Sequence, residues 1–110
     1  MGETDAQLTA GSDLLELTLD AFRVAHRAAS ATAEGLATSS QALFAEVRKH
    51  ERELDSLDRD IDDLVTTTIT RVAEHEARTL LACMKFGISL ERIGDLLLSF
   101  VNRAEAIAAH

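Results

Sequence analysis

Apolar residues recur at steps of three and four along most of this 110-residue chain. Such spacing places them on one face of an α-helix, and we find no segment with the alternating pattern of a half-buried strand. The chain has no proline and only five glycines, so few residues would break a helix. The sequence therefore predicts an all-α protein built from long helices.

The first apolar stripe follows a short polar segment at the N-terminus. We expect residues 1–11 to be flexible and Ser12 or Asp13 to cap the first helix. The apolar positions of this helix are Leu15, Leu19, Phe22, Ala25, Ala29 and Ala33. The stripe is rich in alanine toward its end, which would let another helix approach closely there.

Two interruptions of the pattern predict the turns. The small polar run at residues 37–40 predicts the first turn, with Ser39 or Ser40 capping the second helix. Gly35 is an alternative end for the first helix. The interruption at residues 72–76, which includes His75, predicts the second turn. Because both connections are short, consecutive helices would lie antiparallel.

The second helix carries the clearest periodicity. Its heptad-like stripe consists of Val47, His50, Leu54, Leu57, Ile61, Leu64 and Thr68. The third helix would run from residue 77 to near the C-terminus. Helices of about thirty residues would each be about 45 Å long. The sequence therefore predicts one domain over residues 12–110, an up-down-up bundle of three long antiparallel helices.

The third helix has two apolar faces, although a helix in a three-helix bundle needs only one. One face comprises Leu81, Met84, Ile88 and Leu98, and the other comprises Phe86, Leu90, Ile93, Leu97 and Phe100. The additional face indicates either deeper burial within one chain or an interface between two copies. We expect a homodimer.

Charge and cysteine content narrow the range of functions. The net charge is −8 and the pI is near 4.8, which disfavours nucleic-acid binding and a polybasic membrane anchor. No apolar run reaches the roughly 18 residues of a membrane-spanning helix. The single Cys83 fits a reducing compartment, and the N-terminus lacks the apolar core of a signal peptide. We therefore expect a cytoplasmic protein without direct membrane insertion.

Two pairs of carboxylates are the candidate functional groups. Glu51 and Asp55 form one pair and Glu91 and Asp95 the other, and each pair lies on one face of its helix. Glu91 and Asp95 also interrupt the first apolar stripe of the third helix, where an unpaired charge is costly. If the two helices are neighbours, the four carboxylates can converge on a cation. Such oxygen ligands suit Mg²⁺, Ca²⁺, Mn²⁺ or iron.

Nearby charged residues provide lesser candidates and an alternative. Asp58 and Asp62 lie further along the same side of the second helix. Arg92 is expected to form a salt bridge with an acid on a neighbouring helix. The alternative to a metal site is a solvated acidic face, since residues 46–63 hold eight acids against four bases.

Histidine and glycine positions refine the possible site. The di-iron bundles use Glu-x-x-His pairs, which this chain lacks because Glu46 and His50 are four residues apart. His50 could complete a metal shell beside Glu51 or be a structural histidine. Gly94 costs a helix about 1 kcal/mol relative to alanine, so it indicates close helix approach or room for a ligand beside Glu91.

The acidic motifs resemble the signature of a known family. Glu91-Arg-Ile-Gly-Asp95, preceded by Ser89-Leu90, is similar to the signature of PhoU-type phosphate-transport regulators. Each three-helix repeat of that family carries one E/D-x-x-x-D motif on its second helix and one on its third. Glu51-Arg-Glu-Leu-Asp55 matches the first motif, and Glu76-Ala-Arg78 stands where the family often has Asp-Leu-Arg. The resemblance extends over residues 14–104.

The resemblance implies a regulatory or accessory protein of phosphate uptake or phosphate-starvation signalling, and it does not imply an enzyme. Family members bind metal clusters through these motifs, so it implies that Glu51, Asp55, Glu91 and Asp95 bind a metal, with iron, zinc or manganese expected. The implied partners are a phosphate transporter or the sensor kinase that controls phosphate-starvation genes.

Several alternatives remain open beside this resemblance. Family members usually have two tandem repeats, whereas this chain has room for one, which a homodimer would complement. The chain could also be a cytoplasmic tail domain of a sodium/phosphate cotransporter. Glu76 replaces the usual Asp, and the second turn lacks a proline. A metal-free helical interaction module is the main rival, and a metal-dependent hydrolase would lack an evident general base.

Overall fold

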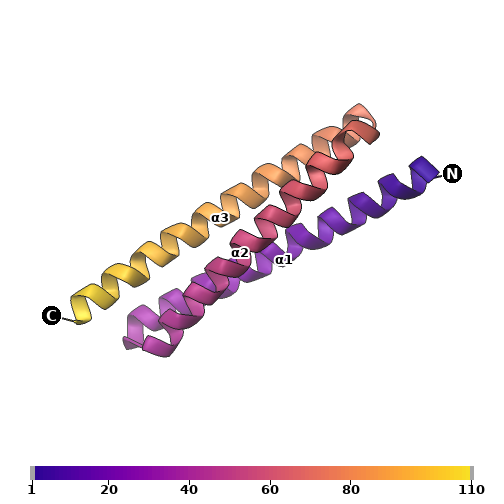
Figure 1. Ribbon diagram of the computed structural model, residues 1–110. Helices are drawn as coiled ribbons and strands as arrows, with labels where there is room; N and C mark the ends of the chain where they lie inside the picture. The colour runs from indigo at the N-terminus through magenta and orange to yellow at the C-terminus, as the bar shows by residue number, and fades with distance from the viewer. Residues whose placement is uncertain (1, 110) are drawn as a thin grey trace.

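Three long helices account for most of the chain, as seen in a computed structural model (Figure 1). The structure describes the backbone of residues 2–109 and the side chains of residues 12–109. Within this part of the chain the elements are α1 (Gly2–Thr38), α2 (Gln41–Thr68), the 3-10 helix η1 (Ile69–Arg71) and α3 (Glu74–Ala108), without any β-strand. The predicted all-α, up-down-up bundle is confirmed.

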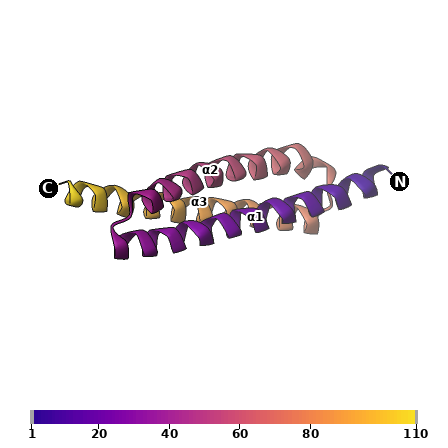
Figure 2. The same cartoon turned by 90° about the horizontal axis from the view of Figure 1, so that it is seen from below.

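The bundle is a rod with principal-axis extents of 62 × 16 × 15 Å. Consecutive helices run antiparallel, and the two ends of the chain lie at opposite ends of the rod (Figures 1 and 2). In Figure 2 the beginning of α1 and the end of α3 each extend beyond the neighbouring turn. No described helix is long and apolar enough to cross a bilayer.

The first turn uses backbone and side-chain caps together. Ser39 has a φ of 55°, and the Ser40 N–H donates to the Gly35 carbonyl at 3.2 Å, which closes the end of α1. The Ser40 hydroxyl then accepts a hydrogen bond from the Leu43 N–H, also at 3.2 Å. Ser40 is therefore the cap of α2, as predicted. The alternative end at Gly35 was wrong, because α1 continues to Thr38.

Two predicted boundaries differ from those observed. The helix α1 begins at Gly2, so Ser12 and Asp13 lie inside it, since no proline interrupts the segment before them. The second predicted turn, at residues 72–76, begins and ends earlier. His75 was predicted in that turn but lies in the first turn of α3, where neighbouring acids favour a helix start.

Two clusters of buried side chains form the core. The larger comprises Leu14, Ala21, Val24, Ala25, Leu54, Ile61, Val65, Leu80 and Leu90. The smaller, nearer the first turn, comprises Ala31, Phe44, Val47 and Val101. Buried members of the predicted α2 stripe contribute to both clusters. The stripe is therefore confirmed as the core face of α2, and burial of each large apolar side chain contributes about 1.5–3 kcal/mol.

The helix α1 packs mainly with a different face from the predicted one, although Ala25 of the predicted stripe is buried. Leu15, Leu19 and Phe22 are exposed by 57%, 44% and 53%. The buried face instead consists of Leu14, Ala21, Val24, Ala25, Ala28 and Ala31, with Thr32 beside them. Both faces have helical periodicity, so periodicity alone did not distinguish them. The small side chains face the bundle because they permit close helix packing, and the large apolar ones remain outside.

The helix α3 packs through a seam that contains two glycines. Leu80, Gly87, Gly94 and Val101 are buried at intervals of seven residues. A Cβ atom added at Gly94 would lie 2.7 Å from Leu54 Cδ1, and one at Gly87 would lie 3.2 Å from Asp58 Oδ1. The close helix approach predicted at Gly94 is therefore confirmed, and the seam brings α3 directly against α2.

This seam also corrects the predicted position of two acids. Glu91 is half-buried and Asp95 is exposed, so neither interrupts the core. The predicted stripe that contained them is peripheral, since Leu81 is exposed and Ile88 is half-buried. The two carboxylates instead flank the glycine seam on the side of α3 next to the acids of α2.

Candidate functional site

Six carboxylates line the junction between α2 and α3. Four lie on α2 at successive steps of four, three and four residues, and two lie on α3. They are Glu51, Asp55, Asp58, Asp62, Glu91 and Asp95. Helical spacing places each set on one face of its helix. The four predicted ligands therefore lie along the facing sides of α2 and α3, and Asp58 and Asp62 extend the acidic set along α2.

The glycine seam sets how closely these side chains approach. The Cβ position of Gly94 is 4.0 Å from Glu51 Cγ, and that of Gly87 is 3.2 Å from Asp58 Oδ1. Larger residues at these glycines would push the helices apart. The absence of two side chains on α3 thus allows carboxylates of α2 to lie against α3.

The pKa of Glu51 is raised above its usual value. Burial is the largest cause, followed by a side-chain hydrogen bond with Asp95 and by the negative charges of Asp95, Asp55 and Glu91. A hydrogen bond between two carboxyl groups requires a shared proton. Glu51 and Asp95 therefore face each other across the two helices.

The pKa values of Asp58 and Glu91 are also raised. For Asp58 the causes are burial, then the charges of Asp62 and Asp55. For Glu91 they are burial, then the charges of Asp95, Asp58 and Asp55, while Arg92 lowers the value. The carboxylates thus act on one another as a continuous group, and binding a cation would relieve their repulsion.

Few basic side chains compensate these acids. Arg59 lies 3.6 Å from Asp55, and both side chains are substantially exposed, so this pair contributes little to stability. Arg92 forms no ion pair with any residue from 12 to 109, which contradicts its predicted role as an interhelical salt-bridge partner. Its exposed position on α3 leaves only a through-space effect on Glu91.

His50 lies outside this acidic group. Its Nδ1 atom is 3.6 Å from Glu53 Oε1 and is buried without a hydrogen bond. Glu53 borders a groove between α1 and α2, so His50 is turned away from Glu51 and Asp95. This arrangement favours the structural histidine over the metal ligand.

The acidic junction has features of a cation site, but its ligands are not preassembled. Asp58 Oδ1 is buried and has no hydrogen-bond partner, and such an oxygen gains most from a bound cation. A cavity of about 240 Å³ adjoins Asp58 and Asp62. Within residues 12–109, however, no three His, Cys, Asp or Glu side chains are already arranged around one metal position. Binding would require small rotamer changes of exposed side chains.

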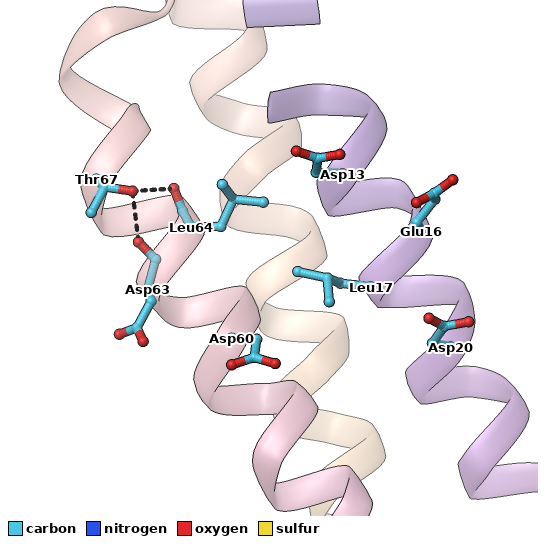
Figure 3. Close-up of a pocket in the computed structure, with 8 residues that line it drawn as sticks. All are labelled: Asp13, Glu16, Leu17, Asp20, Asp60, Asp63, Leu64 and Thr67. Atoms are coloured by element: carbon cyan, nitrogen blue, oxygen red, sulfur yellow. Dashed lines mark hydrogen bonds between the residues drawn. The ribbon is translucent and has the colours of Figure 1, made fainter. Parts of the chain in front are cut away.

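A second acidic groove, between α1 and α2, was missed in the sequence. It has a volume of about 570 Å³ and is lined by Asp13, Glu16, Leu17, Asp20, Asp60, Asp63, Leu64 and Thr67 (Figure 3). The sequence shows that Asp13, Glu16 and Asp20 are three and four residues apart, so they share one face of α1. It does not show that this face lies beside acids of α2, because that depends on how the helices pack.

Comparison with known proteins identifies the family model that this chain fits. The model for the PhoU domain matches residues 12–104, a span that includes both acidic motifs and all three helices. The chain matches no curated protein and no solved structure.

Proposed function

The chain belongs to the PhoU domain family, and on that premise we propose that it is a regulatory or accessory protein of phosphate uptake or of phosphate-starvation signalling. The family is regulatory rather than catalytic and is associated with phosphate transport. The observation that supports this function is the match over residues 12–104, together with the facing acidic motifs on α2 and α3. The protein would act in the cytoplasm, in keeping with its free, half-buried Cys83. It would not catalyse a reaction.

The proposal includes a metal ion held by Glu51, Asp55, Glu91 and Asp95, with Asp58 beside them. The raised pKa of Glu51 and of Glu91 supports it, because carboxylates that repel one another gain from a shared cation. The donors are oxygen atoms alone, so manganese or iron fits better than zinc, whose sites usually include Cys or His. The bound ion would neutralise the junction and join α2 to α3.

Metal analysis of protein purified without chelator tests this assignment. We expect bound iron, manganese or zinc in the wild type and a large loss in Glu91→Gln/Asp95→Asn. The matched control is Glu16→Gln/Asp60→Asn, which removes the same charge from exposed positions of the other groove. Equal metal content in all three proteins would contradict the assignment.

The partner in this proposal is a phosphate transporter or the sensor kinase of the phosphate response. A metal-free interaction module, or a tail domain of a sodium/phosphate cotransporter, is the second candidate. It is favoured by the finding that no three donors from residues 12–109 already surround one metal position. Binding to a transporter or kinase that survives complete chelation would support this second candidate over the metal-dependent one.

We also propose that a second copy of the chain covers an apolar face formed by α1 and α3. Its exposed members are Leu15, Leu19, Phe22, Phe86, Ile93, Leu96 and Phe100. The rings of Phe22 and Phe86 stack with centroids 6.0 Å apart, so the two helices present one continuous face. Exposed apolar patches of this kind usually mark interaction sites. Two copies would also complement the two repeats usual in the family.

Sedimentation velocity tests the dimer. Phe86→Ser/Ile93→Ser should shift the protein to the mass of one chain, because both side chains are exposed and their loss does not disturb the core. Ile107→Ser is the control, since Ile107 is exposed by 76% and lies near the end of α3. A wild-type monomer, or a dimer insensitive to the double substitution, would contradict this interface.

A further inference from the structure

The groove between α1 and α2 combines acidic walls with an apolar floor. In Figure 3, Leu17 and Leu64 lie between the two helices, and Asp13, Glu16, Asp20, Asp60 and Asp63 surround them. Both leucines are half-buried and all five acids are exposed. The Thr67 hydroxyl donates to the backbone carbonyls of Asp63 and Leu64, so its proton is not donated to the carboxylates of the groove.

Cations of the chain itself hardly compensate this groove. Asp20 pairs with Arg23 at 2.9 Å, on the exposed surface. Among residues 12–109, the other four acids form no ion pair, and none of the groove's lining residues is basic. The groove is therefore a negatively charged surface that remains available to a positively charged partner.

The apolar floor limits what kind of partner would fit. A hydrated cation would satisfy the acids but would leave Leu17 and Leu64 in contact with water. A wholly apolar ligand would bury the leucines but would desolvate carboxylates without compensation. A helix with apolar residues on one face and Lys or Arg at its margins satisfies both requirements. We propose that this groove binds a basic amphipathic segment of a protein partner.

The dimensions and neighbouring charges indicate the length of that segment. Asp13 to Asp20 spans about 10 Å along α1, which corresponds to two helical turns. Beyond Asp20, the adjoining groove contains Arg23 and Arg27 opposite Glu53, so the uniformly acidic surface ends there. The segment would therefore be short, about two to three turns, with its basic residues confined to the part that lies over the acids.

This binding site can be tested separately from the metal site. Asp60 borders the groove against α1, whereas Asp58 meets Gly87 of α3. Asp63 borders cavities on both sides and is left unchanged for that reason. The inference rests on the proposed function only in supplying a docking surface for its partner, and it requires no metal.

The experiment uses the full chain and a fluorescent peptide of about twelve residues, or three helical turns, with leucines on one face and lysines at its margins. Glu16→Gln/Asp60→Asn should weaken binding by about tenfold, and salt should weaken wild-type binding. Glu34→Gln/Glu46→Gln removes the same charge from exposed positions outside both acidic sites and should bind like the wild type. A peptide of the same composition in scrambled order should bind more weakly.

Four outcomes of the peptide-binding experiment would overturn the inference. They are the absence of peptide binding, an equal loss in both double variants, equal binding of the scrambled peptide, and displacement of the peptide by Mn²⁺ at an ionic strength held constant. The methyl resonances of Leu17 and Leu64 should shift on binding, and unshifted resonances would also contradict it. A failure of the metal assignment would change none of these results, so the two proposals can fail independently.

Discussion

The two acidic faces of α2 contain the same residue types but differ in what surrounds them. Toward α3, glycines at positions 87 and 94 remove side chains from the interface, and Glu51 meets Asp95 across it. Toward α1, the acids stand around two leucines and none is hydrogen-bonded to another within residues 12–109 (Figure 3). The first arrangement concentrates negative charge at a junction, and the second distributes it around an open groove.

This contrast shows that the surroundings of a carboxylate decide its chemistry more than its spacing along the helix does. At the junction with α3, burial and neighbouring charges raise the pKa of Glu51, Asp58 and Glu91, which favours a proton or a metal ion there. Where carboxylates stand exposed around apolar side chains, they would attract a basic partner. Substitutions at the glycine seam and at individual acids separate these two effects.

The largest effect is expected from Gly94→Val. The added side chain would meet Leu54, whose Cδ1 lies 2.7 Å from the new Cβ position, and should destabilise the fold by about 2 kcal/mol. It should also move the acids of α2 and α3 apart. Urea unfolding measures the loss of stability, and titration followed by NMR should show the pKa of Glu51 moving back toward its usual value.

Ala82→Val is the matched control for this substitution. Ala82 is an exposed residue of the same helix, so the change should cost only about 0.6 kcal/mol of helix propensity. The costs of Leu54→Ala and Gly94→Val should add up to less than their sum in the double variant, since Leu54→Ala removes the side chain that the new valine would meet. Equal destabilisation by the two valines would contradict close packing at the seam.

A smaller effect of opposite sign is expected from Glu51→Gln without metal. The folded-state pKa of Glu51 is raised, so the folded protein holds this proton more tightly than the unfolded chain. The cost of burying the charged Glu51 side chain beside other carboxylates is therefore fully present above the folded-state pKa and is relieved as the pH falls toward the ordinary value. At neutral pH, Glu51→Gln should stabilise the protein by about 0.5 kcal/mol.

Thermal unfolding followed across the acidic pH range checks this prediction. The advantage of Glu51→Gln over the wild type should shrink as the pH is lowered and should vanish once Glu51 is protonated in both states. Glu16→Gln, in the other groove, should show no comparable gain. An advantage that is constant with pH would mean that Glu51 acts through packing rather than through charge.

The smallest effect is expected from salt. Raising the ionic strength screens exposed charges and should raise the melting temperature of the metal-free wild type by about 1–2 °C. Glu91→Gln/Asp95→Asn should respond less than Glu16→Gln/Asp60→Asn, although the two variants have the same net charge. Identical responses would indicate that the total charge, rather than the α2–α3 junction, sets the salt dependence.

Local patterns predicted much of the fold. The periodicity of α2 and the Ser40 cap follow from interactions within one helix or one turn, which a sequence displays directly. The close approach at Gly94 involves two helices, but a glycine inside a helix indicated it. The pairing of Glu51 with Asp55, and of Glu91 with Asp95, has the same local origin. That these two pairs would meet was inferred from the expected antiparallel neighbours, and the structure brings them together.

Features that depend on two helices at once were predicted less well. Leu15, Leu19 and Phe22 have the periodicity of a core face, yet they are exposed because the adjacent alanine face packs more closely. The core seam of α3 passes through Gly87 and Gly94 rather than through either large apolar stripe. For the same reason the acids of α3 flank the core instead of interrupting it.

The amino-acid sequence alone was therefore sufficient to predict the number, type and order of the helices and to find the two acidic motifs, since these depend on residues close together in the chain. The same motifs pointed to the family of the chain. Only the tertiary structure decided which apolar face of α1 is buried, that Glu51 meets Asp95, and that the acids of α1 and α2 enclose Leu17 and Leu64. Those features depend on the rotation of each helix about its axis, which close packing of side chains from different helices sets.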